Sequence, residues 1–185
     1  VLWHGNTTMC VSATVRDAYA LGLGADWLSN YWGTDENLWK LAGKAADGVM
    51  CAGPAYFFAD DRGKMKLVHD YAAKYNPGIP AKDRIKFTVT AWSNVLLLAE
   101  AMKRADKAGD LTGEGILKKG FETMKDYALL DGGLGTAPVN FTVTDHRTTS
   151  IVPVYELKEG KFNFVKTIDV KTRWPEKWDK EWFGW

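Results

Sequence analysis

The sequence has no apolar run long enough to cross a membrane and no excess of charge of one sign. A membrane-spanning helix needs ~20 consecutive apolar residues, and no uninterrupted apolar stretch of this chain approaches that length. The 24 basic and 23 acidic side chains leave a formal net charge of +1. Charge alone therefore gives no surface for a polyanion, and we expect no nucleic acid as a partner.

The patterns typical of metal binding, cofactor binding and catalysis are also missing. The three histidines are isolated in sequence, and Cys10 and Cys51 lack the spacing of metal ligands. Gly22-Leu23-Gly24 follows a helical pattern rather than a strand, so it does not fit a dinucleotide-binding loop. We expect no metal, no cofactor and no enzymatic activity. Two alternatives stay open: a disulfide between the cysteines, and a nucleophilic Cys10 with His4 as its base.

Tryptophan is the residue type in unusual abundance. The chain has nine tryptophans, four of them in the C-terminal tail, where they alternate with charged residues (Trp174, Trp178, Trp182 and Trp185). We interpret the tail as an amphipathic segment that packs in a groove. Extra aromatic side chains also suit stacking against a carbohydrate or an aromatic ligand.

Short strand patterns alternate with helical patterns over the first fifty residues. A helix capped by Thr7 or Thr8 is expected to run to about Leu21, and a second one to follow a cap at Thr34. The strands expected around them are Val1–His4, Ala25–Ser29 and Gly48–Ala52. This alternation predicts an α/β fold with a parallel sheet covered by helices.

The rest of the chain predicts helices followed by strands. Helices are expected over residues 61–75, 90–108 and after Thr112, and strands over 138–144, 150–157 and 161–167, with a tight turn at 158–160. The long helix is expected to bury one stripe, formed by Trp92, Val95, Leu96, Ala99 and Met102. Open parallel sheets usually have five or six strands, so we expect an N-terminal portion to precede these residues.

Several runs, taken in order, resemble one family. They are V-L-W-H-G-N, A-Y-A-L-G-L, W-L-S-N-Y-W-G-T, L-A-G-K-A-A-D-G-V, the helix Val95–Met102, and F-T-V-T-D-H-R with the E-G-K turn. Together they resemble the leucine/isoleucine/valine-binding proteins, and the resemblance covers nearly the whole chain. It implies a parallel-sheet, Rossmann-like lobe of a type I periplasmic binding fold, with a C-terminal helix and β-ribbon that return toward the other lobe.

The resemblance also implies a function. Two lobes would close on a small-molecule solute. Residues 1–80 would form the second lobe, incomplete at its N-terminus, and residues 81–185 the crossover helix, hinge return, ribbon and tail. The partners would be the missing N-terminal lobe of the same protein and an ABC permease in the membrane. The solute would be a branched-chain amino acid or a related aromatic or amide compound.

Two further expectations follow from the resemblance. The protein would be periplasmic or extracellular, with a lipid anchor in a Gram-positive organism. A ligand-sensing domain of the same fold in a regulatory receptor is the alternative function.

The candidate site lies where two strands end. Ligands of open α/β sheets bind beyond the carboxyl ends of the strands, which here are the loops at residues 5–8 and 29–32. By resemblance, Thr7 and Phe87 match ligand-contact positions, and Tyr31 matches a position that is acidic in amino-acid-binding members. The predicted ligand-binding residues are Asn6, Thr7, Tyr31, Trp32 and Phe87.

Tyr31 departs from the family pattern, and this leaves the solute open. A phenol cannot neutralise an ammonium group as a carboxylate does. Either Asp35 or Glu36 takes that role, or the solute is not a standard α-amino acid. Each predicted residue also has a plainer interpretation: Thr7 as a helix cap, Tyr31 and Trp32 as rim aromatics, Phe87 as a core residue and Asn6 as a turn residue.

Overall fold

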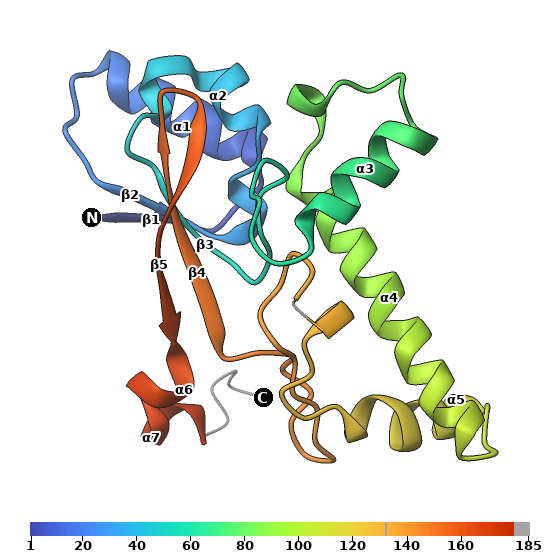
Figure 1. Cartoon of the computed structure of the whole chain (residues 1–185). Helices are drawn as coiled ribbons and strands as arrows, with labels where there is room; N and C mark the ends of the chain where they lie inside the picture. The colour runs from blue at the N-terminus through green and yellow to red at the C-terminus, as the bar shows by residue number, and fades with distance from the viewer. Residues whose placement is uncertain (132, 180–185) are drawn as a thin grey trace.

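Three short parallel strands joined by helices open the fold. The computed structural model describes residues 1–131 and 133–179. Strands β1 (Leu2–His4), β2 (Trp27–Ser29) and β3 (Met50–Ala52) lie side by side in that order. The connections are α1 (Thr8–Ala20), then the 3-10 turn η1 (Tyr31–Gly33), α2 (Asn37–Ala42) and η2 (Gly43–Ala46). The predicted α/β alternation is confirmed (Figure 1).

An antiparallel ribbon completes the sheet. β4 (Ile151–Lys158) pairs with β3, and β5 (Lys161–Asp169) pairs with β4, which gives the strand order β1-β2-β3-β4-β5. The turn between them has positive φ at both central residues, 49° at Glu159 and 80° at Gly160. Such two-residue turns match the twist of paired strands, so the predicted hairpin is confirmed.

The strand predicted over residues 138–144 is wrong. Among the described residues of this segment, only Val139 pairs in a β-bridge, with Tyr127. Asn140 donates its backbone N–H to Thr148 instead. Within residues 1–131 and 133–179 no strand runs alongside this segment, so the alternation of apolar residues alone produced a false signal.

A helical body lies beside the sheet. It contains α3 (Met65–Tyr75), η3 (Ala81–Asp83) and the long α4 (Lys86–Lys107), followed by the short elements α5 (Gly113–Gly115), η4 (Ile116–Gly120), η5 (Phe121–Thr123) and η6 (Leu129–Asp131). Figure 1 shows the chain leaving the sheet after β3, passing through this body and returning as β4. After β5 follow α6 (Val170–Arg173) and α7 (Pro175–Trp178).

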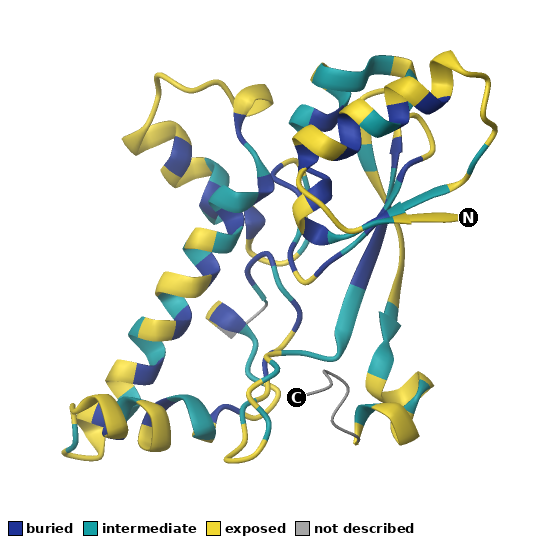
Figure 2. Cartoon of the chain, turned by 180° about the vertical axis from the view of Figure 1, so that it is seen from behind, coloured by how far each residue is buried: buried dark blue, intermediate teal, exposed yellow. Residues whose placement is uncertain are grey.

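Each of the two parts has its own core. The sheet part buries Val11, Val15, Leu38, Ala46, Val49 and Leu157. The helical body buries a larger cluster around Met65, Val68, Val89, Leu97, Ala101, Met124 and Leu134. In Figure 2, β4 is buried along much of its length, whereas β5 is mostly exposed. Helix α3, before residue 80, shares this second core with α4, after residue 80. The division of the chain at residue 80 stays a prediction.

The stripe predicted for α4 is wrong in register. The buried positions are Lys86, Val89, Ser93, Leu97, Ala101 and Ala105, whereas Val95 is 66% and Met102 39% exposed. A Cβ added at Gly120 would lie 2.5 Å from the carbonyl oxygen of Ala101, so this face meets η4 at close range. The small side chain of Ala101 permits that approach, whereas Val95 and Met102 lie on more exposed faces of the helix. Trp92 and Leu96 pack against the core only partly buried.

Other local expectations have mixed outcomes. Thr34 does not cap α2: its hydroxyl donates to the carbonyl of Asn30 at 3.1 Å, and the helix begins three residues later, at Asn37. Cys10 is exposed, Cys51 is buried and both are free thiols, so they form no disulfide. In the tail, the ring of Trp178 packs against a residue from before β4: the guanidinium of Arg147 lies 3.9 Å from the ring centroid. Trp182 and Trp185 lie outside the described residues.

Candidate functional site

The loops after β1 and β2 leave the same edge of the sheet. The two strands run parallel in register, with His4 opposite Ser29 at their carboxyl ends. The Ser29 hydroxyl donates to the carbonyl of His4 at 3.0 Å, and the Asn30 N–H donates to the same oxygen at 3.3 Å. The hydroxyl of Thr8 lies 3.3 Å from the carbonyl oxygen of Trp32, across the two loops. These bonds hold the candidate site together at one edge.

Gly33 allows the two loops to approach closely. A Cβ added there would lie 2.8 Å from the backbone oxygen of Asn6 and 2.8 Å from Val11 Cγ2. These distances are shorter than real Cβ contacts tolerate. The Asn30 side chain fixes the turn by accepting the Gly33 N–H at 2.7 Å. Any other residue at position 33 would therefore push the loops apart.

Three aromatic rings, two adjacent in sequence and one from α4, gather next to these loops. Trp32 and Phe87 stack with centroids 5.1 Å apart and planes inclined by 21°. Tyr31 meets both rings edge-on, at 5.7 and 5.5 Å. Phe87 comes from the first turn of α4, so the long helix contributes to the edge of the sheet. Trp32 is 60% exposed, which leaves part of its ring open to solvent.

A buried lysine lies behind this aromatic cluster of Tyr31, Trp32 and Phe87. Lys86 is 0% exposed, and its Nζ lies 3.8 Å from the Tyr31 centroid and 4.8 Å from that of Phe57. Its polar neighbours are Thr34 Oγ1 at 3.5 Å and Cys51 Sγ at 3.9 Å. Burial lowers the pKa of Lys86 and raises that of the Cys51 thiol. Burial also raises the pKa of the Tyr31 phenol to about 12, and its hydroxyl bonds with Thr90.

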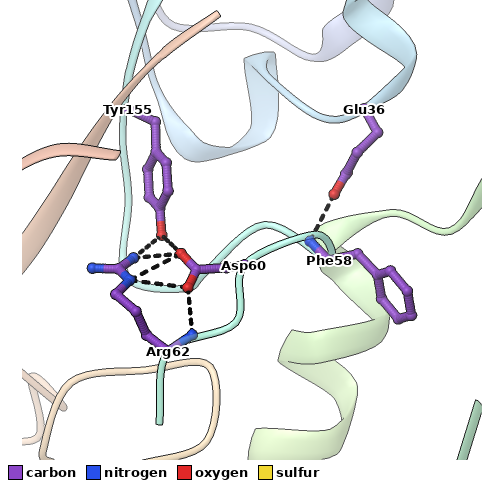
Figure 3. A network of polar contacts seen from close by, with 5 residues as sticks. All are labelled: Glu36, Phe58, Asp60, Arg62 and Tyr155. Carbon is purple, nitrogen blue, oxygen red and sulfur yellow. Dashed lines mark hydrogen bonds and ion pairs between the residues drawn. The ribbon is translucent and has the colours of Figure 1, made fainter. Parts of the chain in front are cut away.

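The two acids of the β2–α2 loop are occupied by hydrogen bonds within the protein. Asp35 accepts the hydroxyl of Thr8 at 3.0 Å and the N–H of Asn37 at 2.8 Å. Glu36 accepts the N–H of Phe58 and the N–H of Lys86, both at 2.8 Å. Burial raises the pKa of Glu36. Figure 3 shows this carboxylate joined to Phe58, in the segment after β3. Its other oxygen joins the loop to the start of α4.

A second polar network ties the outgoing segment to the returning ribbon. Figure 3 shows Asp60, Arg62 and Tyr155 in mutual contact. Arg62 Nε donates to Asp60 at 2.9 Å, and the Tyr155 hydroxyl donates to Asp60 at 2.8 Å. The guanidinium lies between two rings, 4.1 Å from the centroid of Tyr56 and 4.0 Å from that of Phe164. Although burial opposes it, hydrogen bonding to Arg62 lowers the pKa of Asp60.

The predicted site residues fall into two groups. Tyr31, Trp32 and Phe87 contact one another, while Asn6 and Thr7 lie on the neighbouring loop. Thr7 takes the N-cap position of α1, but its side chain makes no capping bond. Lys86 was not predicted: a lysine at a helix start is usually solvated. Only the i, i+4 spacing of Ser93, Leu97 and Ala101 would have revealed the buried face.

The catalytic and metal alternatives find no matching geometry in the described part of the chain. His4 Nε2 bonds with Thr14 Oγ1 at 3.0 Å, and Cys10 Sγ accepts the hydroxyl of Thr7 at 3.9 Å. The pair expected for a base and its nucleophile is therefore not formed. No group of three or more His, Cys, Asp or Glu residues within 1–131 and 133–179 is arranged to hold a metal ion. Within the same residues, no helix has the length and apolarity to span a bilayer.

The strand order, the shared edge and the returning ribbon match a lobe of the type I periplasmic binding fold. The family model for periplasmic binding proteins matches residues 1–161, and the chain belongs to this family. No curated protein sequence matches the chain.

Solved structures share the fold at low sequence identity. A branched-chain amino acid ABC transporter protein from Thermus thermophilus, with bound valine, has a TM-score of 0.79 and 20% identity over 96% of this chain. A fatty acid ABC transporter substrate-binding protein from Thermomonospora curvata has a TM-score of 0.75 and 21% identity over 90%. The chain spans about half the length of these proteins, 48% and 42% respectively.

Proposed function

We propose that this chain forms part of an extracytoplasmic solute-binding receptor of an ABC importer. It captures a small solute between its sheet lobe and a partner lobe of the same protein, and the closed form docks on a permease in the membrane. The solute contacts are Asn6, Thr7, Tyr31, Trp32 and Phe87. Capture and closure make and break no covalent bond, so the role is binding and transfer, in the periplasm or outside the cell.

The observation that supports this proposal is the aromatic cluster at the carboxyl edge of β1 and β2. A partly exposed Trp32 stacked on Phe87 offers a flat apolar face for a solute. The neighbouring loop adds polar groups from Asn6 and Thr7, and an aromatic surface with a few placed polar groups is typical of small-molecule binding. Family membership agrees with this role, because periplasmic binding proteins are receptors for solutes.

The test is a titration of the full-length protein with small solutes, because the proposal includes a partner lobe. The panel contains branched-chain and aromatic amino acids, their amides, and aromatic and aliphatic acids. Binding is measured by calorimetry. We expect one class of solute to bind, and Trp32→Ala to weaken its binding about tenfold, since an aromatic contact is worth about 1 kcal/mol beyond the area it buries.

Tyr19→Ala is the matched control. Tyr19 is 62% exposed, close to the 60% of Trp32, but it lies in the last turn of α1, at the opposite end of that helix from the candidate site. We expect this variant to bind as the wild type does. Absence of binding by every solute, or an equal loss in both variants, would contradict the proposed function.

A further inference from the structure

We propose that this half of the site selects solutes with a flat or branched apolar body and no ammonium group, and that Tyr31 and Lys86 set this preference. The inference rests on the proposed function and names its ligand class: aromatic or branched carboxylates and their amides, rather than free α-amino acids. It follows from the hydrogen-bonding capacity that the structure leaves open around the aromatic cluster.

The carboxylates of the β2–α2 loop and of the segment before α4 are already engaged in bonds within the protein. Asp35 is only 6% exposed, and both of its oxygens already accept protein hydrogen bonds. Glu36 accepts two backbone N–H groups, one on each oxygen. Asp83, which precedes α4, is paired with Lys40 at 2.8 Å. A desolvated ammonium needs acceptors for its three N–H groups. To receive it, Asp35 would have to be uncovered from its buried position. Glu36 would have to accept a further bond while it joins the loop to two other segments.

The phenol ring of Tyr31 offers no substitute. An aromatic ring can hold a cation against its face, but Lys86 Nζ already lies 3.8 Å from the ring centroid of Tyr31. Trp32 and Phe87 pack against Tyr31 in T-shaped contacts, and its hydroxyl bonds with Thr90. A second cation at this ring would also lie near the charge of Lys86. Position 31 therefore discourages an ammonium group instead of receiving one.

The polar groups of the neighbouring loop favour a solute with a carboxylate or carbonyl oxygen over one with an ammonium group. Asn6 Oδ1 accepts the N–H of Thr7 at 2.8 Å, which leaves the two Nδ2 hydrogens of Asn6 as donors. Thr7 does not cap α1, so the first N–H groups of this 13-residue helix keep their donor capacity. Donors match a carboxylate or carbonyl oxygen. The open part of the Trp32–Phe87 stack matches the flat body of the same solute.

The experiment compares solutes that differ only in the ammonium group. The pairs are phenylalanine with 3-phenylpropanoate and leucine with 4-methylpentanoate, each acid also as its amide, titrated into the full-length protein by calorimetry. We expect the ammonium-free member of the better-bound pair to bind at least about tenfold more tightly. Tighter or equal binding of the amino acid overturns this inference but leaves the proposed function standing. No binding by any small solute overturns both.

Variants assign the preference to its residues. Tyr31→Glu places a carboxylate beside the cluster, and we expect the affinity ratio of acid to amino acid to fall about tenfold. Lys86→Met removes the buried cation while keeping an unbranched side chain, so it tests the same ratio if the first variant does not fold. Trp32→Ala is the control, since it weakens both members of a pair and leaves their ratio unchanged. An unchanged ratio in Lys86→Met and Tyr31→Glu overturns the assignment.

Discussion

Gly33→Ala tests whether the two loops of the candidate site meet as closely as the structure indicates. The new methyl group would lie 2.8 Å from the Asn6 carbonyl oxygen and 2.8 Å from Val11 Cγ2, and it would also collide with Ser29 Oγ. None of these atoms moves freely. Val11 is fully buried, the Asn6 oxygen belongs to the backbone, and the Ser29 hydroxyl donates to His4.

The magnitude follows from those three contacts. Extra methyl groups in a well-packed region cost about 1–3 kcal/mol, and three neighbours that cannot yield favour the upper end. We therefore expect the free energy of unfolding to fall by about 3 kcal/mol. For a chain of this size, roughly 2–4 °C is lost per kcal/mol, so the midpoint of thermal unfolding should fall by roughly 6–12 °C.

The assay is urea denaturation followed by circular dichroism, with scanning calorimetry as a second measurement. Gly24→Ala is the matched control, because an added Cβ there meets no atom within 4 Å. We expect this variant to match the wild type or to gain up to about 1 kcal/mol, since alanine restricts the unfolded chain. A Gly33→Ala protein within about 0.5 kcal/mol of the wild type would refute the close approach of the loops.

Three further predictions concern buried polar groups. Burial lowers the pKa of Lys86 below the 10.5 of unfolded lysine, so the unfolded state binds more protons and wild-type stability rises as pH climbs toward 10.5. Any stability advantage of Lys86→Met, measured by urea denaturation, should therefore shrink between pH 7 and 10. Tyr155→Phe removes the hydroxyl that donates to Asp60 and should cost about 1–3 kcal/mol in the same assay. Ser93→Ala leaves the Leu134 carbonyl without its 2.8 Å donor, and calorimetry should show a loss of about 1 kcal/mol.

Local signals were enough to predict the sheet part. Before β3, a strand pattern followed by a hydroxyl residue and by apolar residues at helical spacing occurs twice. Parallel strands joined by helices place their carboxyl ends at one edge of the sheet. The hairpin was equally readable, because Gly160 accepts the positive φ that a two-residue turn requires, and Phe162 and Phe164 alternate with polar residues after it. From these signals alone, the loops carrying Asn6 and Tyr31 could be placed next to each other.

Contacts between distant segments could not be predicted. The i, i+4 spacing of Ser93, Leu97 and Ala101 outlines the buried face of α4, but the approach of Gly120 to Ala101 that favours this face comes from a distant segment. The partners of Glu36 lie 22 and 50 residues away, at Phe58 and Lys86. From the sequence, Glu36 is a loop acid available to a ligand. In the structure it joins its own loop to the segments that carry Phe58 and Lys86.

The residues behind the cluster form one interdependent arrangement. The Lys86 ammonium has no carboxylate within ion-pair distance in the described part of the chain. Its stabilising neighbours are the faces of Tyr31 and Phe57, and its own backbone N–H is held by Glu36. An acid at position 31 would form a buried ion pair with Lys86, and the cost of desolvating both charges would offset much of their attraction. A neutral ring at position 31 and a lysine at position 86 thus depend on each other, and a change at either one should alter the charge that the site accepts.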